Sequence, residues 1–99
     1  MVRTTWRPST RHGELNEAAR DKLPKSAFAF PEQRKEPLTD ASHVRNALAR
    51  FDQVKDVSER DRELAFANIV KAARHYDIEV AEDHWKELGS RPHTKNPKQ

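Results

Sequence analysis

Apolar side chains recur every three or four positions through the middle of the chain, the spacing that places them on one face of a helix. The first stripe consists of Ala41, Val44, Ala47, Leu48, Phe51 and Val54. The second consists of Leu64, Ala65, Phe66, Ile69, Val70, Ala72, Ala73 and Tyr76. The two stripes predict two main helices, at residues 41–54 and 59–76.

Polar residues that favour helix ends stand at the predicted boundaries. Asp40 precedes the first helix and can accept from the amides of its first turn, and we expect His43 to help close this end and to bond the preceding loop. Ser58 precedes the second helix, with Asp61 where a capping box usually has Glu or Gln. Asp77 follows at a position where helices often end in a left-handed residue. Asp40, His43 and Ser58 thus form the predicted capping motif.

Shorter helices are predicted on either side of this pair. Residues 15–23 form a short apolar-periodic segment with Asn16 as its N-cap, and Pro24 ends it because a proline ring disfavours helical geometry at the residue before it. Residues 82–88 predict a final helix that turns Trp85 inward.

One stretch has the alternation of an extended segment. Residues 26–30 read SAFAF, which places Phe28 and Phe30 on the same face. A small hairpin in which Leu38 returns beside Phe28 is one arrangement of this region, although no Asn-Gly or Asp-Gly turn supports it. The sequence leaves the hairpin open.

These patterns predict a mainly α fold, a compact small helical domain. We expect its core to contain six mutually connected large side chains: Leu48, Phe51, Phe66, Ile69, Tyr76 and Trp85. Nearly all hydrophobic residues lie within residues 14–89, which are expected to form a single helical domain. Residues 1–13 are expected to be a flexible basic arm, and residues 90–99 a disordered basic tail.

Charge separates the ends of the chain from its middle. Both end segments contain cations and no acids, so the overall net charge of +3 conceals a net negative middle. The candidate contacts with a polyanion or an acidic partner are Arg3, Trp6, Arg7, Arg11, Arg91, Lys95 and Lys98.

Trp6 has two interpretations. It lies among arginines without a periodic apolar partner. An exposed indole there would stack on a nucleobase or dock in a groove of a partner protein. Alternatively, the indole folds back as a lid on the core. The sequence leaves both open.

The sequence gives little support for a catalytic site or a metal site. The chain has no cysteine and only two glycines, so it lacks thiolate chemistry and a phosphate-cradling loop. An acid–base pair of Asp40 and His43 is the alternative to their capping role, but no nucleophile or oxyanion-forming segment accompanies them. We predict no enzymatic activity, catalytic residue, cofactor or metal site.

Two motifs resemble a known module. Residues 23–28 read LPKSAF, and residues 34–50 read RKEPLTDASHVRNALAR. They resemble an uncharacterised short domain of actinobacterial small proteins and of phage and prophage proteins, recognised by LPxSAF followed by RKxPxxDxSHVRNALAR. The resemblance covers about residues 23–80, and Glu36 departs from the aromatic residue often found there. It implies a fold but no established activity.

The resulting hypothesis is a small non-enzymatic interaction module whose unidentified protein partner presents an acidic surface to the basic arms. One alternative is a nucleic-acid-binding accessory protein that acts through the arms. Another, which rests only on the resemblance, is a structural component of a phage-like particle. Short apolar runs and the absence of an apolar leader predict no membrane association, and a cysteine-free chain fits the cytoplasm.

Overall fold

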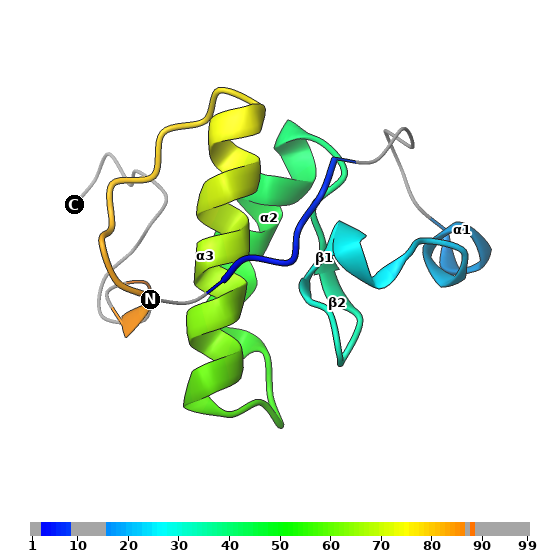
Figure 1. The fold of residues 1–99 in the computed structure, drawn as a ribbon, viewed down its shortest axis with the longest axis horizontal. Coiled ribbons are helices and arrows are strands. Elements are labelled where there is room, and N and C mark those ends of the chain that lie inside the picture. Colours follow the sequence, from blue (N-terminus) through cyan, green and yellow to red (C-terminus); the bar gives the residue numbers. More distant parts are fainter. Residues whose placement is uncertain (1–2, 9–15, 87, 89–99) are drawn as a thin grey trace, which may run out of the picture.

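The two apolar stripes form the two longest helices of the computed structural model, which describes residues 3–8, 16–86 and 88 (Figure 1). These helices are α2 (Ala41–Arg50) and α3 (Glu59–His75). The described residues also include a short helix α1, two 3-10 helices and a two-stranded sheet, so the mainly α prediction holds in outline. α3 packs against α2 and the first strand, and α2 packs against the second strand.

α2 ends at Arg50 and not at Val54, because the chain tightens there into the 3-10 helix η2 (Phe51–Gln53). Arg62 of α3 donates hydrogen bonds to the carbonyl oxygens of Phe51 at 3.2 Å and Val54 at 2.7 Å. Carbonyls at a helix end need partners outside the helix. Here a side chain of α3 supplies a partner to the first carbonyl of η2 and to that of the residue after it.

The predicted caps of α3 are confirmed. The Ser58 hydroxyl accepts from the amide of Asp61 at 3.0 Å, and the Asp61 carboxylate accepts from the amide of Ser58 at 3.1 Å, which completes a capping box. At the other end Asp77 has a φ of 61°, in the left-handed region. This turn directs the amide of Ile78 back to the carbonyl of Ala73 at 2.7 Å.

The hairpin that the sequence left open is present, with Pro37 and not Leu38 opposite Phe28. Strand β1 (Phe28–Phe30) pairs antiparallel with strand β2 (Lys35–Pro37), the first residue of β1 lying opposite the last of β2. The amide of Leu38 then donates to the carbonyl of Ala27 at 2.8 Å. The predicted extended segment is therefore the first strand of a hairpin, preceded by the 3-10 helix η1 (Lys25–Ala27).

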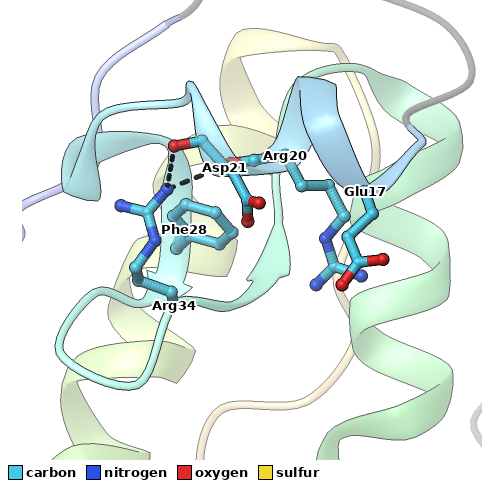
Figure 2. A pocket seen from close by; sticks show the side chains of 5 residues that line it. All are labelled: Glu17, Arg20, Asp21, Phe28 and Arg34. Carbon is cyan, nitrogen blue, oxygen red and sulfur yellow. Dashed lines mark hydrogen bonds between the residues drawn. The ribbon is translucent and has the colours of Figure 1, made fainter.

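α1 (Glu17–Asp21) lies beyond the hairpin from α3 (Figure 1). It is shorter than predicted, but Asn16 caps it as expected by accepting from the amide of Ala19 at 2.8 Å. Arg34 of the hairpin turn donates to three carbonyl oxygens at the other end, those of Arg20, Asp21 and Leu23. Figure 2 shows the Arg34 guanidinium beside the Phe28 ring and bonded to the end of α1. The guanidinium carbon is 4.8 Å from the ring centroid. These contacts fasten α1 to the hairpin.

The helix predicted at residues 82–88 is wrong at its start. Residues 82–84 are not helical. The amide of Lys86, which a helix would direct to a backbone carbonyl, donates to Nδ1 of His84 at 3.2 Å. The amide of Leu88 donates to the carbonyl of Trp85 at 3.0 Å, and residues 87 and 89 lie outside the described residues.

The larger of two buried clusters joins α2, α3 and the hairpin, and a smaller one consists of Leu23, Ala27 and Phe28. Phe51 and Ile69 are buried in the larger cluster, as predicted. The other four predicted core residues are partly buried against the same cluster: Leu48, Phe66, Tyr76 and Trp85. Among the described helices, none has the length and apolar character needed to cross a membrane.

Residues 3–8 also lie against this core. Trp6 is 1% exposed, its Nε1 donates to the carbonyl of Leu38 at 3.0 Å, and its ring meets those of His75 and Tyr76 edge-on. The lid interpretation of Trp6 is thus confirmed, and its assignment as an exposed contact is wrong. The flexible-arm prediction is likewise wrong for this segment, because a buried indole with a bonded N–H holds it in place.

Candidate functional site

A polar cleft of about 160 Å³ opens between α1, β2 and α2. α2 contributes His43, Asn46 and Arg50, which share a helix face because they are three and four residues apart. Arg20 of α1 and Glu36 of β2 line the opposite side. Three elements therefore bring together two guanidinium groups, an imidazole, an amide and a carboxyl.

The helix cap positions the imidazole of this cleft. The Asp40 carboxylate accepts from the amide of His43 at 2.9 Å, which caps α2 as predicted. Nδ1 of His43 lies 2.7 Å from the same carboxylate oxygen and 3.4 Å from the Thr39 hydroxyl, so the expected bond to the preceding loop is also present. An ionised carboxylate only accepts, so Nδ1 carries the proton in this pair and Nε2 is the nitrogen outside it.

Glu36 is the most unusual residue of the cleft. Its φ is 56°, a left-handed value that costs a non-glycine residue about 1–3 kcal/mol. Burial raises the pKa of its carboxyl, against the opposing effect of the positive charges of Arg50, Arg20, Lys35 and His43. Strain and a perturbed carboxyl in a cleft are features that gather at functional sites.

Glu36→Gln is expected to raise the free energy of unfolding at neutral pH. A carboxyl whose pKa is raised by folding is stabilising below its unfolded pKa, and that stabilisation is lost as pH rises through the folded pKa. The gain in free energy of unfolding of Glu36→Gln over the wild type should therefore be absent at pH values below 4.5, the ordinary pKa of a Glu carboxyl. It should grow as the pH rises above that value. Urea unfolding across this range measures the effect, with Glu63→Gln on the exposed surface of α3 as the control for charge. Destabilisation by Glu36→Gln at neutral pH would contradict the prediction.

Residues 7–83 match a protein family described as a family of unknown function, DUF6582. The chain belongs to this family. The match spans most of the chain and includes every residue of the cleft and both main helices. A search of curated proteins and a search of solved structures found no match.

The structure divides the sequence-predicted contacts of this DUF6582 protein into three groups. Arg3 and Arg7 are exposed, and the amide of Arg7 donates to the carbonyl of Ser26 at 3.0 Å. Trp6 is buried. The remaining contacts lie outside the described residues: Arg11, Arg91, Lys95 and Lys98. The described contacts are therefore attached to the domain and do not form a free arm.

Sequence reasoning identified only His43 among the residues that line the cleft. It missed four other side chains of the cleft: Arg20, Glu36, Asn46 and Arg50. One signal was available in α2, since His43, Asn46 and Arg50 follow helical spacing on the polar side of the stripe. Another was Glu36, at a position where the motif that the chain resembles often has an aromatic residue.

The two predicted capping sites of the DUF6582 domain differ in their surroundings. Ser58 and Asp61 engage each other, and Asp61 also accepts from the Gln33 side chain at 3.0 Å. Asp40 and His43 form a pair whose imidazole lines the cleft. No group of three or more potential metal ligands is found within the described part of the chain.

Proposed function

We propose that this protein is a small non-enzymatic interaction module that engages an acidic surface of a partner protein. The observation that carries the proposal is the cleft between α1, β2 and α2, where Arg20 and Arg50 come from different helices. Both arginines are exposed, so their charges are available to a partner. His43, which lines the same cleft, is held in place by Asp40 and adds a fixed polar group to it.

The physical basis is electrostatic complementarity. Basic side chains on a rigid frame steer an acidic partner and fix its orientation. Lys35 adds a further positive charge close enough to influence Glu36. Arg3 and Arg7, on the segment attached to the core, extend the set of exposed cations.

The cellular setting is part of the same proposal. A cysteine-free chain suits the reducing cytoplasm. The LPKSAF and RKEPLTDASHVRNALAR motifs support an origin among actinobacterial and phage-related proteins.

The proposal is tested by anisotropy titrations of the full chain with a fluorescein-labelled glutamate-rich peptide, a matched neutral peptide, and single- and double-stranded DNA. We expect the acidic peptide to bind with a shallow dependence on salt. The double variant Arg20→Glu/Arg50→Glu should weaken this binding at least roughly tenfold.

A matched control separates the cleft from net charge. Lys55→Glu/Lys71→Glu makes the same change of charge at exposed positions outside the cleft, and it should have a much smaller effect. Equal losses in both double variants would contradict a role for the cleft. Tighter binding to DNA with a steep salt slope would instead favour the nucleic-acid alternative.

A further inference from the structure

A groove of about 390 Å³ lies along α3, on the side of the helix away from α1. Its other wall is the chain that follows α3, which turns at the end of the helix and runs back beside it (Figure 1). The groove shares no lining residue with the cleft between α1, β2 and α2. It is therefore a second, separate hollow of the domain.

The floor of the groove is apolar. Phe66, Val70 and Ala73 line it from α3, because residues four and seven positions apart lie on the same side of a helix. Ile78 and Val80 line it from the other wall. Val70 is half-buried and, within the described part of the chain, is not among the side chains packed against the core cluster. The groove thus offers apolar surface that the core does not use.

The turn at the end of α3 positions the second wall. Asp77 has a left-handed φ of 61°, and the amide of Ile78 donates to the carbonyl of Ala73 at 2.7 Å. These features set the direction in which the chain leaves the helix. A site whose walls are already positioned loses less conformational freedom when a ligand binds.

The rim of the groove is mainly acidic. Glu79, Glu82 and Asp83 line it, and Arg74 is the cation among its lining residues. Glu79 and Asp83 are exposed, and Glu82 is half-buried. Negative charge therefore exceeds positive charge around an apolar floor. Such an arrangement attracts a cationic partner and fixes its orientation.

We infer that this groove docks a basic segment of a partner protein that has apolar side chains between its lysine or arginine residues. The apolar side chains would lie on the floor and the cations would meet the acidic rim. The chain's own residues 90–99 contain cations but no hydrophobic residue, so they match only the rim. Every lining residue lies within residues 7–83, so the groove is part of the DUF6582 domain.

Anisotropy titrations of the full chain with a short fluorescein-labelled peptide of alternating lysine and leucine test this inference. We expect the peptide to bind the wild type, and Glu79→Lys/Glu82→Lys to weaken binding at least roughly tenfold. Glu59→Lys/Glu63→Lys makes the same change of charge at exposed positions of α3 outside the groove, and it should have a much smaller effect.

Two further comparisons test the apolar floor. Val70→Lys places a cation on it and should also weaken binding at least roughly tenfold. A peptide with serine in place of leucine should bind the wild type at least roughly tenfold more weakly, because it buries no apolar surface. None of the substituted positions is fully buried, so circular dichroism should show the helix content of the wild type in each variant.

Several outcomes would overturn the inference. These include no binding of the lysine–leucine peptide to the wild type, equal losses in the two double variants, and equal binding of the serine peptide. Tighter binding by the full-chain variant Arg91→Ser/Lys95→Ser/Lys98→Ser would identify the chain's own tail as the occupant. Dimers of the wild type that Val70→Lys separates in analytical ultracentrifugation would identify a second copy. The cleft variant Arg20→Glu/Arg50→Glu should not weaken peptide binding, so the groove and the cleft fail independently.

Discussion

Trp6→Ala is expected to destabilise the protein by about 3–5 kcal/mol, the usual cost of truncating a large buried aromatic side chain. The indole is 1% exposed and contacts the rings of His75 and Tyr76. Its loss removes this packing and leaves the carbonyl of Leu38 without its N–H donor. The free energy of unfolding of a native protein is about 5–15 kcal/mol, so this variant would lose a large part of its stability. Urea unfolding followed by circular dichroism measures the change.

Two further variants divide this effect into its components. Trp6→Phe keeps an aromatic ring but removes the N–H, so it should cost about 1–3 kcal/mol, less than the alanine variant. Trp85→Ala removes an indole that is only partly buried against Phe51, and it should also cost less. Wild-type stability in Trp6→Ala would mean that residues 3–8 do not pack on the core in solution.

Asn68→Ala is expected to destabilise the protein by a comparable amount, about 2–6 kcal/mol. The side chain is fully buried and makes four hydrogen bonds, with the amides of Thr5 and Trp6, the Thr5 hydroxyl and the carbonyl of Ala29. Alanine leaves at least two buried backbone groups without partners, and each costs about 1–3 kcal/mol. Thermal and urea unfolding provide the measurement.

Asn46→Ala is the matched control for this substitution. Asn46 is exposed on α2, and alanine favours a helix there, so its stability should change little. Asn68→Asp should be at least as damaging as Asn68→Ala, because it removes the donor to Ala29 and places a charge in the core. A small loss of stability in both Asn68 variants would show that the four hydrogen bonds do not hold residues 3–8 against α3.

The cleft and the packing of residues 3–8 on the core could be predicted only in part from the sequence. His43 was identified through its capping role, but its neighbours Arg20 and Glu36 come from elements that the chain pattern does not place beside α2. Asn68 interrupts the apolar stripe of α3, which indicates a buried polar group, but its bonding partners lie up to 63 residues away in the chain. In both cases the residues that meet are far apart in the chain, so no short stretch of sequence contains all of them.

What the sequence by itself determined is local. The apolar stripes placed α2 and α3, and Asp40, Ser58 and Asp77 marked three of their ends correctly. These features depend on backbone geometry and on bonds between residues three to five positions apart. A short stretch of chain therefore contains all the information that they need.

Only the tertiary structure decided where Trp6 goes, that residues 35–37 pair with β1, and that α2 stops at Arg50. Each outcome involves a partner from another element: the carbonyl of Leu38, the backbone of β1, or the guanidinium of Arg62, which bonds the η2 segment after α2. The free energy of such contacts exists only once the elements are packed, because burial and hydrogen-bond geometry are set by both partners together.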